Sequence, residues 1–232
     1  KHFFSSIFKN SKKIRSKNKL KKKFFITVAI DSPAAAGAGT QSKLIAKHYN
    51  LLYLDTGKIY RYIGYLKLKS EKQFSYKLVE KKVKNLNLKF LKKKILQTDD
   101  VATSASLVAR KKIIRDIVHK FQKKIAYNPP KKFNGSILDG RDITSIQLKN
   151  ATFKFYITAS LKVRAERRFK EYRNLKKEIS LSEVIKSIKK RDKSDRNRKY
   201  GPLVKTKDSI LINTSKLSKK ACFKKIKAIM DR

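Results

Sequence analysis

The segment 32–40 has the residue types of a phosphate-binding loop. It reads SPAAAGAGT, follows an apolar run and precedes a helical pattern. Small residues allow backbone N–H groups to surround an anion at a helix N-terminus, and a hydroxyl such as that of Thr40 can bind Mg²⁺. Two positions depart from the Gly-x-x-x-x-Gly-Lys-Ser/Thr pattern, because Ser32 replaces its first glycine and Ala38 replaces its lysine. A small-residue turn that binds nothing is therefore an alternative to a nucleotide site.

A second group of polar residues follows the apolar run 51–54. Thr56 brings a hydroxyl next to a sharp turn, Tyr60 an aromatic face and Arg61 a guanidinium that can grip a phosphate at two points. These residues predict a site for a phosphate-bearing molecule. A capped helix, with Thr56 as its cap and Tyr60 in the core, explains the same pattern.

The apolar run 136–140 ends in a third polar group. Arg141 can clamp a phosphate, and Asp142 can accept a hydrogen bond from the amino group of a base. Asp139 precedes them and offers a carboxylate that can bind Mg²⁺ near a phosphate. A salt bridge at the strand end explains Arg141 and Asp142 less well, since the residues that follow offer no partner charge. We therefore expect both to bind a ligand.

Arginine marks further candidate positions, because only 13 of the 62 Lys and Arg residues are arginine. Two predicted helix faces carry Arg164, Arg167 and Arg168 at i, i+3 and i+4, and Arg191, Asp195 and Arg198 at i, i+4 and i+7. Ser160 is expected to cap the first helix. Like charges on one face repel unless an anion or acids neutralise them, and Glu166 alone cannot. A solvated basic face is the alternative, although a lysine-rich chain would build it from lysine.

Five apolar runs of strand length alternate with helical patterns around these groups. The runs are 24–30, 51–54, 136–140, 153–159 and 209–213, and the helical patterns lie at 41–49 and around 104–127, 160–173, 181–198 and 217–231. This alternation predicts an α/β fold with a doubly wound parallel sheet. Ligands bind such sheets at the carboxyl ends of the strands, where the polar groups stand. The lysine-rich stretch 66–100 has weak periodicity and is expected to form a small inserted lobe.

Composition limits the class of protein. A chain of 232 residues suits one α/β unit with mobile lobes, and no apolar run reaches the roughly 18 residues of a membrane span. The single cysteine, Cys222, excludes an internal disulfide framework and favours a reducing cytoplasm. The net charge of +45 attracts any phosphate-bearing partner. Residues 1–23 hold ten Lys or Arg and no acid, so we expect a disordered basic arm there and a single folded domain at 24–232.

Six motifs, in this order, resemble those of bacterial cytidylate kinases. They are SPAAAGAGT, LLYLDTGKIYR, VATSASLVARKKIIR, ILDGRDI, ITASLKVRAERR and RDKSDRNRKYGPL, and the resemblance covers roughly residues 24–232. It implies a phosphate-loop kinase fold with a five-stranded parallel sheet flanked by helices, a lobe for the nucleoside monophosphate at about 62–130 and an arginine-bearing lid at about 160–200. It also implies transfer of the γ-phosphoryl group of ATP to CMP or dCMP with Mg²⁺.

The resemblance also implies roles for individual residues. ATP would be bound by Ser32, Pro33, Ala34, Ala35, Ala36, Gly37, Ala38, Gly39 and Thr40, with Thr40 also binding Mg²⁺. CMP would be bound by Thr56, Tyr60, Arg61, Ser106, Arg115, Arg141, Asp142, Arg191, Asp195 and Arg198. The catalytic residues would be Arg164, Arg167, Arg168 and Asp139. Ser106 would read the cytosine and Arg115 would bind phosphate, whereas Arg110 matches no family position and is expected at the surface.

Two other functions are compatible with the sequence. The alanine at position 38 removes a cation from the β and γ phosphates, which could cost on the order of 10²–10³ in rate. The chain could then be a nucleotide-binding protein with weak or lost activity, unless a neighbouring lysine substitutes. A basic RNA-associated protein is the second alternative, but the sequence has no RNA-binding aromatic motif. We expect a cytoplasmic monomer that uses CMP or dCMP, ATP and Mg²⁺, with no specific nucleic-acid partner and no membrane partner.

Overall fold

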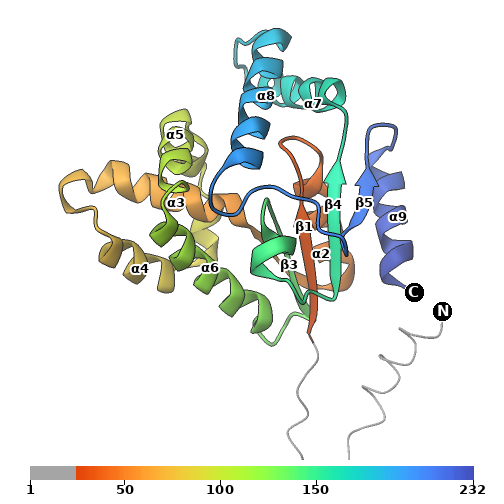
Figure 1. The fold of residues 1–232 in the computed structure, drawn as a ribbon, viewed down its shortest axis with the longest axis horizontal. Helices are drawn as coiled ribbons and strands as arrows, with labels where there is room; N and C mark the ends of the chain where they lie inside the picture. Colours follow the sequence, from red (N-terminus) through yellow and green to blue (C-terminus); the bar gives the residue numbers. More distant parts are fainter. Residues whose placement is uncertain (1–24) are drawn as a thin grey trace, which may run out of the picture.

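The computed structural model describes residues 25–232 and contains one parallel sheet (Figure 1). Its strands are β1 (Ile26–Asp31), β2 (Leu51–Asp55), β3 (Gly135–Gly140), β4 (Phe153–Thr158) and β5 (Ile210–Asn213), in the order β2-β3-β1-β4-β5. The predicted five-stranded, doubly wound sheet is confirmed. The disordered arm predicted for 1–23 lies outside the described residues.

The strand order places the segment 32–40 at the centre of the sheet. β1 is the central strand and pairs with β3 on one side and with β4 on the other. The connections to these two neighbours therefore run to opposite sides of β1, and the segment after β1 lies where they diverge. Ligands bind at this kind of switch point in open α/β sheets. Val28, Ala29 and Ile30 are fully buried because helices cover both faces of the sheet. Successive residues serve opposite faces: Ala29 belongs to one apolar cluster, and Val28 and Ile30 belong to the other.

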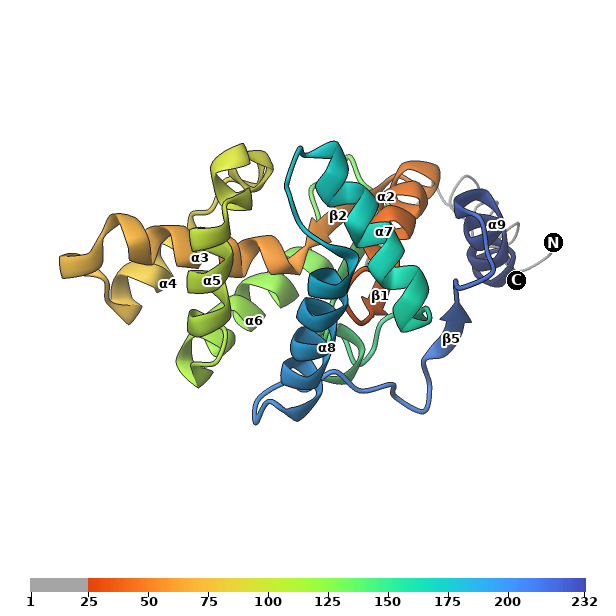
Figure 2. The same cartoon turned by 90° about the horizontal axis from the view of Figure 1, so that it is seen from above.

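Of the described helices, the first packs directly against the sheet, and the others form three groups around it. Their bounds are α2 (Ala38–Tyr49), α3 (Thr56–Lys69), α4 (Tyr76–Lys84), α5 (Asp99–Val108), α6 (Lys112–Tyr127), α7 (Leu161–Asn174), α8 (Leu181–Asn197) and α9 (Lys219–Met230). Figures 1 and 2 show α3 to α6 as a lobe on one side of the sheet, α7 and α8 beyond the tips of the strands, and α9 beside β5. None of the described helices is long and apolar enough to cross a membrane.

The helical pattern expected around 104–127 is two helices instead of one. In α5 the buried residues include Val101, Ala105 and Val108, and the same stripe would continue at 111 and 112, which are both lysine. The buried stripe of α6 starts instead at Ile114. This change of phase means that one straight helix cannot bury both stripes, so the chain turns at 109–111.

The stretch 66–100 is more ordered than its weak periodicity indicates. Beyond the end of α3 it contains α4 and the short 3₁₀ turns Glu71–Gln73, Leu88–Lys92 and Lys94–Gln97. Val79 and Val83, one turn apart on α4, are buried in the apolar cluster of the lobe. Two apolar residues suffice to dock this helix, and that is too short a signal to find in a lysine-rich background.

Candidate functional site

The segment 32–40 forms the connection between β1 and α2 that its small residues predict. Gly37 caps α2 with a left-handed backbone (φ 96°), and Ala38 is the first residue of the helix. Backbone N–H groups at a helix start have no partner within the helix and favour anions. Ala38 is 6% exposed and packs in the apolar cluster beneath the loop. The loop therefore offers backbone donors to a phosphate but no side-chain cation at position 38.

Arg164 ties helix α7 to this loop. Its Nη1 donates to the carbonyl oxygen of Ala34 at 3.0 Å and lies 2.7 Å from Oδ2 of Asp192 on α8. Oδ1 of Asp192 in turn accepts a hydrogen bond from the backbone N–H of Ala34 at 3.3 Å. Both side chains are less than 10% exposed. Arg164 and Asp192 therefore hold the loop in shape from α7 and α8.

The other two arginines of α7 also have partners. Arg167 donates to the hydroxyl of Thr214 at 2.9 Å and to its carbonyl oxygen at 2.8 Å, and the Thr214 hydroxyl donates to the carbonyl of Ala36. Arg168 pairs with Glu171 at 2.9 Å. Acids other than Glu166 therefore neutralise two of the three arginines, Asp192 on α8 for Arg164 and Glu171 on the next turn of α7 for Arg168, whereas Arg167 contacts only neutral groups. Ser160 caps α7 as predicted.

Two carboxylates stand beside the start of α2. Asp139 ends β3 and is the register partner of Asp55, which ends β2. A methyl group placed on Gly39 would lie 3.3 Å from Oδ2 of Asp139 and 3.4 Å from the hydroxyl of Tyr53. Burial and the nearby charge of Asp55 raise the pKa of Asp139. Like charges so placed favour either a proton or a cation between them, and Mg²⁺ typically takes one or two carboxylates together with phosphate oxygens and water.

Thr56 links the start of α3 to the same place. Its hydroxyl donates to the carbonyl oxygen of Asp139 at 2.7 Å, while the residue that caps α3 is Asp55. The alternative in which Thr56 caps the helix is therefore wrong. A methyl group on Gly140 would come within 2.5 Å of this hydroxyl, so the close contact of α3 with the end of β3 depends on a glycine there.

Asp142 lies at the centre of a buried cationic cluster. It forms an ion pair with Arg115, and its carboxylate lies 3.4 Å from His119 and 3.9 Å from Arg198. Burial alone would raise its pKa, but the close approach of His119 and the charges of Arg115 and Arg198 outweigh that effect and lower the pKa. Asp142 is therefore an ionised acceptor at neutral pH.

Arg141 and α8 form the second half of this cluster. Nε of Arg141 lies 2.7 Å from Oδ2 of Asp195, and Arg198 and Arg191 lie 3.4 and 3.9 Å from the same carboxylate group. The residues that follow Arg141 and Asp142 offer no partner charge, as the sequence indicates, but α6, α8 and the turn after it do, so the salt bridges set aside as the weaker explanation are present. The structure does bring Arg141, Asp142, Asp195 and Arg198 together, as a shared ligand requires.

Polar atoms without partners face this cluster from the lobe. The buried hydroxyl of Tyr60 and the buried Nε of Arg115 have no hydrogen-bond partner within the described structure, and the guanidinium of Arg115 lies 5.6 Å from the centre of the Tyr60 ring. Arg61 donates to the carbonyl of Leu96 at 3.0 Å, and burial together with the nearby charge of Arg168 lowers its pKa. Buried donors and crowded cations of this kind favour an anionic, hydrogen-bonding ligand.

Ser106 lies on α5 with an exposed side chain, and Arg110 is exposed as expected. Four residues that organise the site are absent from the sequence prediction: His119, Asp192, Gly201 and Thr214. Gly201 adopts a left-handed backbone (φ 60°), and a methyl group there would overlap the Arg115–Asp142 pair. The Gly-Pro pair at 201 and 202 is a turn signal that indicates a special backbone position. The other three contacts depend on tertiary packing and have no local signal.

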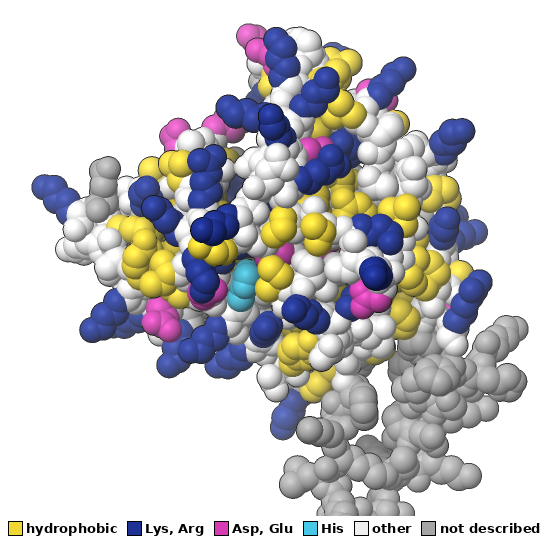
Figure 3. Space-filling view, viewed as in Figure 1, with side chains coloured by type: hydrophobic (Ala, Val, Ile, Leu, Met, Phe, Trp, Pro, Cys, Tyr) yellow, Lys and Arg dark blue, Asp and Glu magenta, His cyan; other side chains and the backbone are white. Residues whose placement is uncertain are grey.

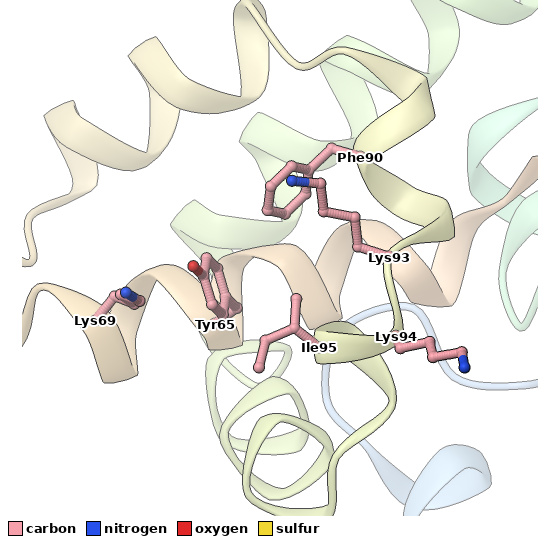
Figure 4. Close-up of a pocket in the computed structure, with 6 residues that line it drawn as sticks. All are labelled: Tyr65, Lys69, Phe90, Lys93, Lys94 and Ile95. Carbon is pink, nitrogen blue, oxygen red and sulfur yellow. The ribbon is translucent and has the colours of Figure 1, made fainter.

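A surface pocket elsewhere contains none of the predicted residues. It is lined by Tyr65, Lys69, Phe90, Lys93, Lys94 and Ile95 (Figure 4). The ammonium of Lys93 lies 4.8 Å from the centre of the Phe90 ring. Figure 3 shows Lys and Arg side chains scattered over the visible face instead of gathered in one patch. On that face, the positive charge of the described residues therefore does not indicate one particular binding surface.

Comparison with known proteins identifies the family. The family model for cytidylate kinase matches residues 28–232. A cytidylate kinase of Fusobacterium nucleatum is 40% identical over 204 residues, covering 83% of this chain and 91% of the relative. One from Azorhizobium caulinodans is 38% identical over 205 residues (88% and 98%), and one from Clostridium botulinum is 36% identical over 218 residues (89% and 98%).

A solved structure shares the fold. The crystal structure of an uncharacterized protein from Eubacterium ventriosum aligns with a TM-score of 0.53 at 15% identity, covering 89% of this chain and 98% of that one. The match to the family model and the identities above extend over most of the chain. The chain therefore belongs to the cytidylate kinase family.

Proposed function

We propose that this chain transfers the γ-phosphoryl group of ATP to CMP or dCMP. The observation that carries the proposal is the cluster of Arg141, Asp142, Asp195 and Arg198 beside the phosphate loop. It combines cations for a monophosphate with a buried, ionised carboxylate for a base. Two polyanions can then meet across the ends of β1 and β3. Phosphoryl transfer depends mainly on such positioning and on neutralising charge.

The donor nucleotide is bound by the loop. Backbone N–H groups at 37–40 and the start of α2 face the phosphates of ATP, and the contact of Arg164 with Ala34 keeps the loop in this shape. Arg167 and Arg168 extend from α7 toward the same region and close over the transferred group. Thr40, with its exposed side chain, lies in the first turn of α2 and is free to meet a phosphate-bound metal ion.

Mg²⁺ fits the residues present. Asp139, supported by Asp55, supplies carboxylate oxygens, and Thr40 supplies a hydroxyl. When bound, the ion neutralises charge on the outer phosphates of ATP. Tyr53 donates a hydrogen bond to Asp139 at 3.2 Å, which orients the carboxylate. These side chains need to move no proton, because the transferred group passes directly between phosphate oxygens.

The acceptor nucleotide is bound by the cationic cluster. Arg141, Arg61 and Arg191 surround its phosphate, and Thr56 and Tyr60 border it from α3. Asp195 and Arg198 contact the sugar. Asp142 accepts a hydrogen bond from the amino group of cytosine, assisted by Ser106 and Arg115. A carboxylate at this position repels the carbonyl oxygen that uracil carries instead, so the site selects cytidine nucleotides.

A coupled assay of ATP consumption tests this function. CMP, dCMP, UMP and AMP are each offered as acceptor to the purified chain. We expect turnover with CMP or dCMP that exceeds turnover with UMP and AMP. No activity with either cytidine nucleotide contradicts the proposal. We further propose a monomer in a reducing cytoplasm, which suits the buried thiol of Cys222, and size-exclusion chromatography of the purified chain tests the monomer.

A further inference from the structure

The start of α2 lacks the cation that phosphate loops place there. In other loops of this kind a lysine at the position of Ala38 reaches the β and γ phosphates. The methyl group of Ala38 is buried and cannot do so. Arg167 is near, since its Nη1 lies 3.7 Å from where a methyl group on Gly37 would stand, but its donors bind Thr214 and Ala36. Arg167 therefore meets the transferred group only after it releases these partners, and a further side chain is needed to supply the charge absent at position 38.

Lys58 is the lysine whose environment fits this requirement. In the described part of the chain, the lysines that are not exposed are Lys58, Lys67, Lys154 and Lys227. The last two are paired with Asp208 and Asp231. Lys67 lies nine residues further along α3, which places it about 13 Å away along the helix axis. Lys58 is half-buried and forms no hydrogen bond or ion pair with the described residues.

The fold brings the first turn of α3 close to the first turn of α2. Both flank Asp139: its carbonyl oxygen accepts the Thr56 hydroxyl, and its carboxylate lies against Gly39. Lys58 lies in the same turn as Thr56 but on a different face of the helix, because residues two apart do not face the same way, and an extended lysine side chain spans about 6 Å. Figure 2 shows α3 running outward into the lobe from β2, so its first turn is the part that lies at the strand ends.

The position of Lys58 is also locally unfavourable. It lies in the first turn of α3, which contains no acidic residue other than Asp55 at the cap. The positive end of the helix dipole disfavours a cation there by about 0.3–1 kcal/mol. Residues that violate a local rule without a local benefit concentrate at functional sites. A ligand with negative charge at the strand ends would supply that benefit.

The geometry points to Lys58 as the cation that replaces the absent lysine at position 38. This inference rests on the proposed function. The Lys58 ammonium donates hydrogen bonds to the outer phosphate oxygens of ATP and neutralises the charge that builds up on them during transfer. It forms no covalent bond and gives up no proton. The cation thus reaches the phosphates from α3, whereas a lysine at position 38 would reach them from α2.

A double-mutant cycle tests the inference. The variants are Lys58→Met, Ala38→Lys and the combination of both, with Lys67→Met as the matched control on the same helix. kcat/KM for ATP is measured at saturating CMP, and the dissociation constants of ATP and of CMP are measured separately by calorimetry. Thermal unfolding confirms that each variant folds. Lys58→Arg tests whether a second cation restores activity.

We expect Lys58→Met to lower kcat/KM for ATP on the order of 10²–10³-fold and to leave CMP binding within about threefold. With lysine present at position 38, the same change should cost less than about tenfold, and Lys67→Met should have no effect. An equal loss in both backgrounds, or no loss in either, overturns the inference. If the natural chain proves inactive toward CMP, the ATP dissociation constant still decides: about tenfold weaker binding in Lys58→Met supports the role, and unchanged binding refutes it.

Discussion

Arg115 and Asp142 form an ion pair whose side chains are only 2% and 7% exposed. They come from α6 and from the turn after β3, so the pair joins the lobe to the sheet at the proposed acceptor site. Gly201 lies against both side chains, and Arg198 contacts Asp142 from the turn that contains Gly201. The pair therefore couples the stability of the fold to the shape of the proposed base pocket.

Replacing Arg115 by methionine should destabilise the protein. The change leaves Asp142 buried with weaker partners, and removing one member of a buried pair typically costs about 3–5 kcal/mol. Arg198 and His119 remain nearby, which places the expected loss near 3 kcal/mol. Urea unfolding measures it. The exposed Arg110→Met in the adjacent turn is the control and should change stability by less than about 0.5 kcal/mol. Equal effects of the two changes would contradict the view of Asp142 as a paired, buried charge.

Replacing Asp142 by asparagine should relax the choice of base. Asparagine can donate a hydrogen bond to the carbonyl oxygen of uracil, whereas the carboxylate only accepts. We expect the ratio of kcat/KM for CMP to that for UMP to fall by about 100-fold or more. Steady-state assays with both acceptors measure it. Asp116→Asn, on the exposed side of α6, serves as the control and should leave the ratio unchanged. A preserved ratio in Asp142→Asn would place base recognition elsewhere.

The sheet can be predicted from the sequence because its strands are buried on both faces. Val28, Ala29 and Ile30 make a continuous apolar run that a surface element would not tolerate, and the other runs behave in the same way. The phosphate loop can be predicted because strand, small residues and helix follow each other within a few residues. The turn between α5 and α6 is harder to find, since it depends on the phase of buried positions on either side of 109–111.

The partners of the site arginines cannot be predicted from local sequence. Asp192 on α8 neutralises Arg164 on the neighbouring helix α7. Asp195 neutralises Arg141, from which it is 54 residues away in the sequence. These contacts exist because α7 and α8 pack together over the strand ends, which no short pattern encodes. The motifs single out the arginines that contact the loop and the cluster, but whether an arginine faces a ligand or fixes the backbone is decided by tertiary contacts.

Asp31 should make the protein less stable as the pH rises, whereas an acid in a salt bridge usually makes it more stable. Burial raises its pKa from 3.8 to about 6, against the hydrogen bonds from Thr144 and Ile143. Its protonated form is therefore favoured in the folded state. The contribution of Asp31 to stability is highest below pH about 4 and is lost as the pH rises toward about 6.

The difference in unfolding free energy between the natural chain and Asp31→Asn isolates this effect, because the other acids are common to both. That difference should fall by up to about 3 kcal/mol between pH about 4 and pH about 7, since one pKa unit corresponds to about 1.4 kcal/mol. Urea unfolding across this range measures it. The fixed cost of losing an acceptor oxygen shifts the whole curve without changing its slope. A difference that rises with pH would mean that the hydrogen bonds from Thr144 outweigh burial.

Gly64 should tolerate no larger residue, because α3 and α5 touch there. A methyl group at this position would lie 2.6 Å from the backbone nitrogen of Ala105 and 3.0 Å from the carbonyl oxygen of Val101, and backbone atoms cannot rotate away. Gly64→Ala should therefore cost about 1–3 kcal/mol despite the better helix propensity of alanine. Gly57→Ala on the same helix is the control. Its methyl group would meet only the movable side chain of Asp55 at 3.3 Å, so its stability should stay within about 1 kcal/mol of the natural chain. If both changes have the same effect on the urea midpoint, the helices separate easily and the lobe is not fixed by this contact.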